Sequence, residues 1–294
     1  MFQGSMVAIV TPMKADGAID DDGLARLIEF HIEQGTDAIV SVGTTGESAT
    51  LSMNEHAQVV QRTINLVAGR VPVIAGSGAN NTREAIELAQ KAEKAGAAAH
   101  LSVVPYYNKP TQNGMIAHFR AIADAVALPM LLYNVPGRTV VDMLPETTAA
   151  LAAHERIVGI KEAEGSLERT RALIEQCPDE FVILSGEDPS ACESILLGAK
   201  GVISVTANVA PAMMHDMCAA ALRGDAAEAR ALNTRLEPVH RAMFAQSSPA
   251  PAKWSLTEMG LIQPHVRLPL LALEGSCFDT VREALESADC LAVA

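Results

Sequence analysis

The sequence predicts an α/β fold, namely a (β/α)8 TIM barrel followed by a C-terminal helical extension. Eight short apolar runs recur along the first two thirds of the chain, and the segments between them carry helical signals. Eight strands that alternate with helices are the pattern of a closed barrel of parallel strands. A further helical stretch follows the eighth run, and it is longer than the last barrel helix requires.

Each apolar run has the length of a strand and carries few charges. The runs do not alternate between apolar and polar residues, which indicates strands covered on both faces, as in a parallel sheet. In chain order they span residues 6–10, 38–42, 71–76, 100–104, 128–133, 157–161, 181–186 and 201–205.

The segments between the runs are predicted to be helices. Apolar residues spaced three and four apart indicate an amphipathic helix after the first run, and they are Leu24, Leu27, Ile28 and Ile32. The stretches "SMNE" (52–55) and "NTRE" (81–84) fit the capping-box pattern at helix starts. Helices are expected to end near glycines that follow the periodic residues, at Gly35, Gly69, Gly96 and Gly198.

A doubly wound open sheet is the competing fold. Such a sheet would carry a glycine-rich fingerprint after the first strand, and this chain has "TPMKADG" (11–17) there instead. "GSGANN" (76–81), after the third run, matches only in part and is more typical of a turn. We therefore expect a catalytic barrel over residues 1–224 and a C-terminal helical region over residues 225–294. In that region "AEARALNTRLEPVHRAMF" (227–244) is the clearest helix.

Composition argues against several classes of function. With 22 Lys and Arg against 35 Asp and Glu, the net charge is −13, which argues against a nucleic-acid partner. The eight histidines and five cysteines form no metal-ligand pattern, so we expect no metal and no cofactor. Scattered cysteines without a CxxC pair indicate a reducing, cytoplasmic compartment. The start "MFQGSMVAIVTP" fits neither a signal peptide nor a membrane span.

Polar residues gather where the apolar runs end. In a TIM barrel the carboxyl ends of the strands form one rim, and that rim carries the active site. Four features fall there: "GTTGES" (43–48), "PYYNKP" (105–110), "YNVPGR" (133–138) and Lys161 at the end of the sixth run. All three tyrosines of the chain lie in these stretches, and phenols gathered at a rim suggest proton transfer.

Lys161 is the most unusual residue of the rim. It follows "IVGI" (157–160) without a polar transition, and lysine is rarely buried unless it is paired or functional. Burial disfavours the charged ammonium, and a free amine attacks a ketone to form a Schiff base. The alternative is a structural ion pair. Neighbouring Glu162 is a poor partner for it, because adjacent strand residues face opposite sides.

The other rim residues have two interpretations each. Tyr133 either shuttles protons during imine formation or only packs through its ring. Arg138 offers a bidentate fork for a carboxylate or is a solvated loop arginine. "GTTGES" either holds a carboxylate through backbone N–H groups and hydroxyls or is a simple tight turn. The coincidence of four signals at four strand ends favours one common site.

Seven motifs, in order, resemble those of the dihydrodipicolinate synthase family. They are "GSMVAIVTPM", "GTTGESATL", "VIAGSGAN", "PYYNKPTQNG", "LYNVPGRT", "GIKEA" and "GVISVTANVAP". The resemblance covers essentially the whole chain and is weakest after about residue 265. The same superfamily of pyruvate-dependent class I aldolases includes N-acetylneuraminate lyase and the keto-deoxy-sugar acid aldolases, which share the barrel and the lysine.

The resemblance implies a Schiff-base lyase that condenses pyruvate with aspartate semialdehyde to 4-hydroxy-tetrahydrodipicolinate, the first committed step of the diaminopimelate and lysine pathway. Lys161 would form an imine and then an enamine with pyruvate, and Tyr133 would donate and accept protons. Thr44 and Tyr107 would complete the proton relay. The implied substrate-binding residues are Thr45 for the pyruvate carboxylate, Arg138 for the semialdehyde carboxylate, the Ile203 carbonyl near Lys161, Gly43 and Gly186.

The resemblance also implies a homotetramer, a dimer of dimers, in which Tyr107 reaches into the site of a neighbouring subunit. Many bacterial members are inhibited by L-lysine at the tight-dimer interface, and the matching positions here are Ser48, Ala49, Met53, His56, Asn80, Glu84 and Tyr106. Lysine-sensitive members carry histidine in place of Met53, and a thioether cannot supply the same polar contact. From the residues alone, Glu84 is also explained as a helix cap and His56 as an exposed helix residue.

Two other hypotheses stay open from the sequence. A related lyase would use the same lysine with a sugar or another aldehyde as acceptor, and turnover with aspartate semialdehyde separates the two. The second hypothesis is a non-catalytic barrel that binds a metabolite and regulates or scaffolds. The intact set of Lys161, Tyr133, Thr44, Tyr107 and Arg138 argues against it.

Overall fold

Eight parallel strands form a closed barrel in the computed structural model, which describes residues 2–291. The strands follow chain order around the barrel, and β8 closes it by pairing with β1. They are β1 (Gly4–Ala8), β2 (Ala38–Ser41), β3 (Val73–Gly76), β4 (Ala99–Val103), β5 (Met130–Asn134), β6 (Ile157–Glu162), β7 (Val182–Ser185) and β8 (Gly201–Ser204). Each predicted run overlaps one strand, so the predicted TIM barrel is confirmed.

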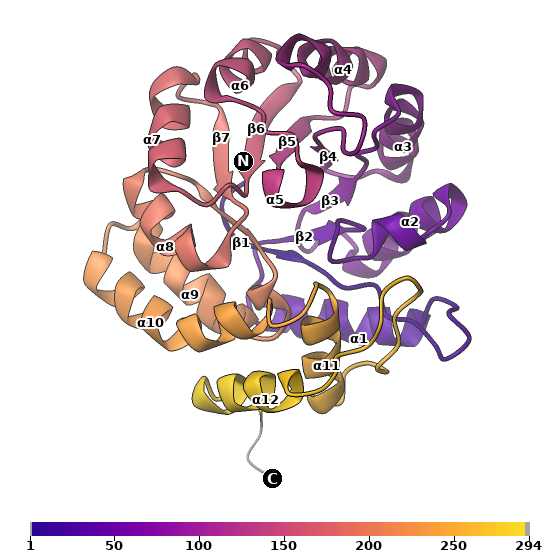
Figure 1. The fold of residues 1–294 in the computed structure, drawn as a ribbon, viewed down its shortest axis with the longest axis vertical. Coiled ribbons are helices and arrows are strands. Elements are labelled where there is room, and N and C mark those ends of the chain that lie inside the picture. The colour runs from indigo at the N-terminus through magenta and orange to yellow at the C-terminus, as the bar shows by residue number, and fades with distance from the viewer. Residues whose placement is uncertain (1, 292–294) are drawn as a thin grey trace.

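Helices on the outside of the barrel connect the strands, as Figure 1 shows. They are α1 (Asp21–Glu33), α2 (Met53–Val67), α3 (Thr82–Ala95), α4 (Gln112–Ala125), α6 (Pro145–Ala152), α7 (Leu167–Gln176), α8 (Asp188–Leu197) and α9 (Pro211–Leu222). The short helix α5 (Pro136–Thr139) follows β5, and two 3-10 turns, η1 (Ser48–Thr50) and η2 (Thr206–Asn208), follow β2 and β8. The predicted alternation of strand and helix is therefore present throughout the barrel.

The core has two layers, because both faces of the sheet are covered. Alternate strand residues pack inside the barrel, such as Met6 and Leu131, or against the helices, such as Val7 and Leu132. All four are fully buried. This explains why the strands appear as continuous apolar runs rather than as alternating ones.

The helix ends follow the predicted signals in most cases. Ser52 and Glu55 form a reciprocal capping box at the start of α2. At α3 Asn81 caps the helix but the predicted box does not form, because its side chain accepts from the Arg83 N–H instead of the Glu84 N–H and its side-chain amide, not its backbone, donates to Glu84. Gly96 ends α3 with a φ of +86°, a backbone conformation that glycine adopts without strain.

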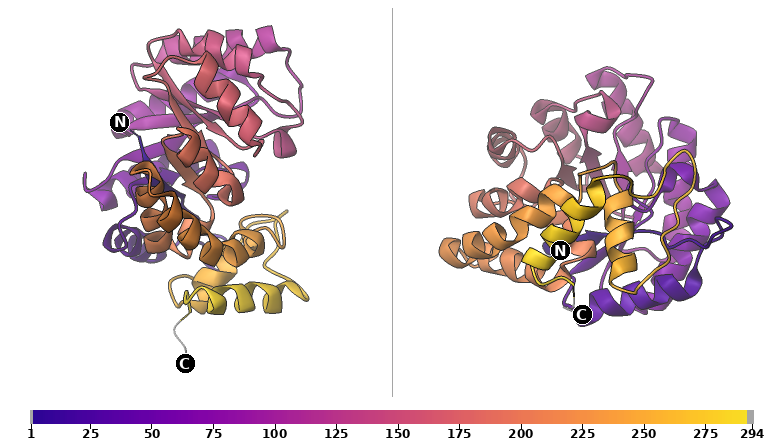
Figure 2. Two further views of the ribbon diagram at one scale, coloured as in Figure 1. Left: turned by 90° about the vertical axis from the view of Figure 1, so that its left-hand side faces the viewer. Right: turned by 60° about the horizontal axis from the view of Figure 1, so that its bottom comes forward.

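Three further helices follow the barrel: α10 (Ala226–Ala242), α11 (Ala250–Glu258) and α12 (Cys277–Ser287). They gather at one end of the molecule in the left view of Figure 2, and α10 packs on α8, α9 and α12. We propose that residues 1–224 form the catalytic barrel and 225–294 the helical region; residues 1 and 292–294 lie outside the described residues. Across residues 2–291, no helix is both long and apolar enough to cross a membrane.

Candidate active site

A narrow pocket lies at the carboxyl ends of the strands. Tyr133 is the last residue but one of β5 and Lys161 the last but one of β6, and the loop after β2 closes another side of the pocket. Of the residues predicted for catalysis or substrate binding, those that line it are Lys161, Tyr133, Thr44, Thr45, Arg138, Ile203, Gly43 and Gly186. The structure therefore brings together every predicted residue of these two groups except Tyr107.

Lys161 lies inside the barrel with only 5% of its surface exposed. It stands in register between Tyr133 of β5 and Leu184 of β7, and its Nζ lies 4.4 Å from the centroid of the Tyr133 ring. Within residues 2–291 it forms no ion pair with a carboxylate at 4.0 Å or less. Glu162 instead hydrogen-bonds Asn134 on the other face of the sheet. The structural ion pair with Glu162 is thus not formed.

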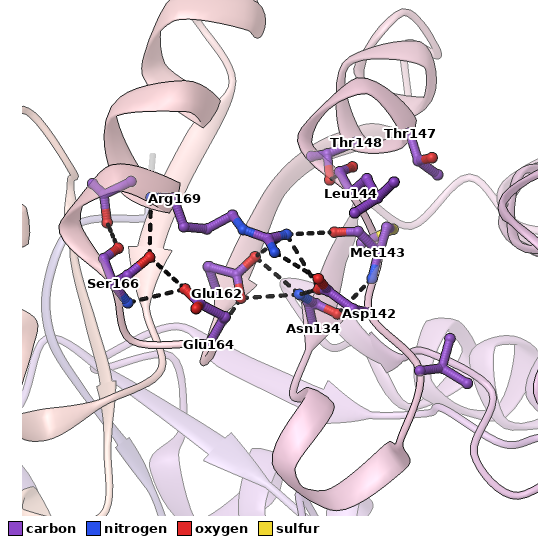
Figure 3. A network of polar contacts seen from close by, with 12 residues as sticks. Asn134, Asp142, Met143, Leu144, Thr147, Thr148, Glu162, Glu164, Ser166 and Arg169 are labelled. Atoms are coloured by element: carbon purple, nitrogen blue, oxygen red, sulfur yellow. Dashed lines mark hydrogen bonds and ion pairs between the residues drawn. The ribbon is translucent and has the colours of Figure 1, made fainter.

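A polar network lies behind Lys161 and Tyr133, between the sheet and the helices (Figure 3). Asn134 and Glu162 are the next residues along β5 and β6, so their side chains point away from the pocket. The Asn134 side-chain amide donates to both Glu162 oxygens at 3.0 and 3.1 Å and to Asp142 at 2.8 Å. Arg169 of α7 donates to Asp142 at 2.6 and 3.2 Å and lies 4.0 Å from Glu162.

Two carboxylates in this network share one guanidinium. Burial raises the pKa of Glu162 to about 7, against hydrogen bonds from the Glu164 N–H and from Asn134. Burial also acts to raise the pKa of Asp142, but hydrogen bonds from Arg169 and Asn134 outweigh it and lower that pKa. The network supports the strand pair that carries Tyr133 and Lys161. It also holds the segment after α5, because the Met143 N–H donates to Asn134 at 3.0 Å.

Gly186 leaves the space that the Lys161 side chain occupies. A Cβ atom on residue 186 would lie 2.9 Å from the Lys161 Cε and 2.6 Å from the Ala163 Cβ. Such contacts are too short for carbon atoms, so a larger residue would displace the lysine. At Gly43, by contrast, the nearest atom to an added Cβ is a Val40 methyl at 3.9 Å.

The loop 43–48 forms a strained turn beside the pocket. Its Glu47 N–H donates to the Thr44 carbonyl at 3.0 Å, and Thr11 donates to the Gly46 carbonyl at 2.7 Å. Val42 and Glu47 have φ values of +55° and +59°, a conformation that costs about 1–3 kcal/mol for a residue other than glycine. The tight turn predicted as an alternative is present, and the same turn presents Thr44 and Thr45 to the pocket.

Arg138 and Tyr107 lie at the edges of this arrangement. Arg138 is exposed on α5 and lines the pocket together with Lys161, and its role as a fork for a carboxylate stays a prediction. Tyr107 is 90% exposed, has a φ of +73°, and does not line the pocket of its own chain. In the part of the chain that the structure describes, no group of three or more His, Cys, Asp or Glu side chains is placed to hold a metal ion.

Comparisons with known proteins identify the family. The model of the Dihydrodipicolinate synthetase family matches residues 1–288. The chain belongs to this family. The 4-hydroxy-tetrahydrodipicolinate synthase of Pseudomonas aeruginosa is 57% identical over 292 residues, which are 99% of this chain and 100% of that protein.

Solved structures of the dihydrodipicolinate synthetase family superpose closely on the chain. The chloride-inhibited dihydrodipicolinate synthase of Acinetobacter baumannii, complexed with pyruvate, is 51% identical with a TM-score of 0.98, and the match covers 99% of this chain and 100% of that one. The enzyme of Cyanidioschyzon merolae with lysine bound is 39% identical with a TM-score of 0.96, covering 99% of each chain. The resemblance stated from the motifs is confirmed.

A second cavity of about 390 Å³ adjoins the pocket and shares Thr44 and Arg138 with it. Of the residues that the family resemblance assigns to lysine binding, it is lined by Ser48, Ala49, Met53, His56, Glu84 and Tyr106. Asn80 does not line it, although its side-chain amide donates to the Tyr106 carbonyl at 3.1 Å.

His56 is buried, with its Nε2 2.7 Å from the Gly76 carbonyl and its pKa lowered by burial. The alternative of an exposed His56 is wrong. Glu84 accepts from the cap residue Asn81 at 3.3 Å and also faces the cavity.

Several pocket residues were not predicted from the sequence. Phe244 and Ser248 of the C-terminal region line the pocket, and within residues 2–291 the buried Ser248 hydroxyl has no hydrogen-bond partner. No local pattern marks them, because the sequence of this stretch indicates only a helix. Glu187 also lines the pocket; burial raises its pKa, against the opposing charges of Lys161 and Arg138. Glu187 could have been predicted from its place directly after Gly186, at the carboxyl end of β7, where the pocket lies.

Proposed function

We propose that the chain carries out the reaction of its family through a Schiff base on Lys161. It is a lyase that condenses pyruvate with L-aspartate 4-semialdehyde to 4-hydroxy-tetrahydrodipicolinate, the first committed step of diaminopimelate and lysine biosynthesis. The observation that carries the assignment of Lys161 is its position: it is buried beside the Tyr133 ring, and no carboxylate of residues 2–291 lies within 4.0 Å of its amine. The location is proposed to be cytoplasmic, and no cofactor is required.

The chemistry proceeds in three steps on this chain's residues. The Lys161 amine attacks the ketone carbon of pyruvate, and loss of water leaves an imine. Removal of a methyl proton gives the enamine, whose carbon attacks the aldehyde of the second substrate while the aldehyde oxygen gains a proton. The amine of that substrate then attacks the imine carbon, which closes the ring and releases Lys161. Tyr133 exchanges these protons, with Thr44 and a partner subunit's Tyr107 as relay.

The two substrate carboxylates are proposed to bind on opposite sides of the imine. Thr45 and the backbone of residues 43–46 hold the pyruvate carboxylate, because residues 43–45 line the same pocket as Lys161. Arg138 at the outer edge offers a fork for the carboxylate of the semialdehyde. Ile203 lines the same space, and Gly43 and Gly186 keep it open.

The proposed assembly is a homotetramer, a dimer of dimers. Its support in this chain is Tyr107, an almost fully exposed phenol on a strained loop, which is far better placed to serve a neighbour than its own pocket. The cavity lined by Ser48 and Glu84 is the proposed site for L-lysine as feedback inhibitor. Since Met53 lines this cavity with a thioether, we expect only weak inhibition by lysine.

Reductive trapping tests the covalent step. Borohydride added with pyruvate is expected to add one reduced pyruvyl group to Lys161, detected by mass spectrometry of the protein and its peptides. Absence of the adduct on Lys161 contradicts the proposal. A coupled assay with pyruvate and aspartate semialdehyde, with and without lysine, then tests the acceptor. Activity only with N-acetylmannosamine or glyceraldehyde would assign the chain to a related lyase.

A further inference from the structure

The C-terminal region contacts the strained loop 43–48 through a buried charged cluster. Lys253 of α11 forms an ion pair with Glu47, and the two side chains are 2% and 0% exposed. Lys253 Nζ also donates to the His265 carbonyl at 2.8 Å. The Arg267 backbone N–H donates to the second oxygen of the Glu47 carboxylate at 3.1 Å. Residues of the C-terminal region thus hold both oxygens of Glu47.

The Arg267 side chain adds contacts on either side of this pair. Its Nε donates to the Gly17 carbonyl at 2.8 Å, and its two terminal nitrogens donate to the Thr50 carbonyl at 3.0 Å and to Glu55 at 2.6 Å. In Figure 1 the loop after α11 accordingly runs beside the N-terminal loop that precedes α1. The stretch from Glu47 to Glu55 is therefore fixed at both ends by one C-terminal segment.

A buried ion pair of this kind is not explained by fold stability alone. Removing two charges from water is costly, and buried pairs replaced by neutral residues of similar size often leave stability unchanged or higher. Burial lowers the pKa of Lys253, and the Glu47 charge opposes that shift. The pair does fix the position of Glu47, whose backbone has a left-handed conformation. Glu47 lies three positions after Thr44 and two after Thr45.

We propose that the Glu47–Lys253 pair, together with Arg267, positions the pyruvate-binding loop, so that the C-terminal helical region sets the affinity of the barrel for its first substrate. The proposal rests on the proposed function, in which Thr45 and the backbone of residues 43–46 hold the pyruvate carboxylate. Lys253 and Arg267 are positioning residues, since neither lines the pocket. A loop released from them places its donors less well, which weakens pyruvate binding before it slows the chemistry at Lys161.

Variants of both partners separate positioning from folding. Lys253→Met leaves an unpaired buried carboxylate and is expected to unfold at lower temperature. The double variant Glu47→Gln with Lys253→Met removes both charges and is expected to melt near the wild type. It should still need about tenfold more pyruvate for half-maximal borohydride trapping, with kcat within about threefold of the wild type, since the loss equals about one well-placed hydrogen bond.

A milder variant keeps the test decisive if the double variant does not fold. Arg267→Gln keeps the Glu47–Lys253 pair and is expected to raise the KM for pyruvate about threefold, with the KM for aspartate semialdehyde unchanged. The matched control is Arg230→Gln, which removes an exposed ion pair, 2.7 Å long, between Arg230 of the C-terminal region and Glu193 of α8. It should retain wild-type values.

The outcomes distinguish this proposal from the proposed function. A wild-type protein that forms no pyruvyl adduct would overturn the proposed function itself. A second outcome would overturn only the positioning role. In it the wild type traps pyruvate, and the folded variants Glu47→Gln/Lys253→Met and Arg267→Gln trap it at the same concentrations. The cluster would then serve only the fold. A variant that loses kcat with an unchanged KM for pyruvate would likewise overturn the positioning role.

Discussion

Two lysines are buried near the pocket, one lining it and one behind the loop 43–48, and their surroundings differ. Lys161, on the β5–β6 wall, has 5% of its surface exposed, lies over the Tyr133 ring and, among the residues that the structure describes, has no carboxylate within 4.0 Å. Lys253, behind the loop 43–48, is 2% exposed and is fully paired with Glu47 and the His265 carbonyl. A buried lysine whose charge is satisfied holds structure in place, whereas one without a partner is available as a nucleophile.

The two walls are also supported from different parts of the chain. Behind Lys161, the network of Asn134, Asp142, Glu162 and Arg169 comes from neighbouring elements of the barrel, with Arg169 27 residues from Asp142. Behind the loop, Arg267 reaches Glu47 from a position 220 residues away. We therefore expect perturbations of the first wall to change the chemistry, and perturbations of the second to change pyruvate affinity.

Exchange of the reactive lysine tests the contrast most strongly. Lys161→Met is expected to abolish pyruvate trapping and to reduce kcat by about 10³-fold or more, because the covalent path is lost. Its melting temperature should not fall, since no ion pair is broken. A variant that loses stability and keeps activity would reverse the roles assigned to the two lysines. The coupled assay and thermal unfolding, run beside Lys253→Met, give both readouts.

The network behind Lys161 should give the protein a pH-dependent stability. Glu162 has a pKa of about 7 in the folded protein against an ordinary value of 4.5. Between these values the unfolded chain is ionised while the folded chain keeps its proton, so stability falls as the pH rises through this window. The loss is about 3 kcal/mol, and Glu162→Gln should abolish it.

Urea unfolding at pH 5 and pH 8 measures this effect. The Glu162→Gln variant should gain about 2–3 kcal/mol relative to the wild type on going to the higher pH. The control is Glu168→Gln, since the Glu168 side chain is 83% exposed and should show no such change. Parallel pH curves for the wild type and Glu162→Gln would contradict the raised pKa.

The space around Lys161 provides the next test of the same wall. Gly186→Ala places a carbon 2.9 Å from the Lys161 Cε, so the lysine must move. A misplacement of about 1 Å costs roughly 10²-fold in rate, and we expect that loss in kcat and in the rate of borohydride trapping. Gly137→Ala is the control, because nothing lies within 4 Å of its added carbon. Equal rates for the two variants would show that Lys161 tolerates displacement.

The sequence predicts the wall that carries Lys161 better than the contacts that the C-terminal region makes with the loop 43–48. The eight strands, Lys161 and Tyr133 were accessible because burial on both faces produces apolar runs, and a polar residue at the end of such a run is conspicuous. Asn134 and Glu162 were accessible in principle, since each follows a pocket residue and must face the helices. The pairing of Glu47 with Lys253 and the approach of Phe244 and Ser248 were not, because no local pattern specifies contacts across so much of the chain.

The smallest expected effects test whether the two walls of the pocket act independently of each other. Arg169→Gln removes the cation shared by Asp142 and Glu162, and we expect kcat to fall about fivefold with the KM for pyruvate within about twofold. Arg267→Gln is expected to raise the KM for pyruvate about threefold and to change kcat less than Arg169→Gln does. Within residues 2–291 the two arginines share no hydrogen-bond or ion-pair partner, so the free-energy effects on kcat/KM should add in the double variant to within about 0.5 kcal/mol. A larger interaction energy would mean that the C-terminal region also acts on Lys161. The assignment of catalysis to the wall that carries Lys161, and of pyruvate affinity to the loop 43–48, would then be wrong.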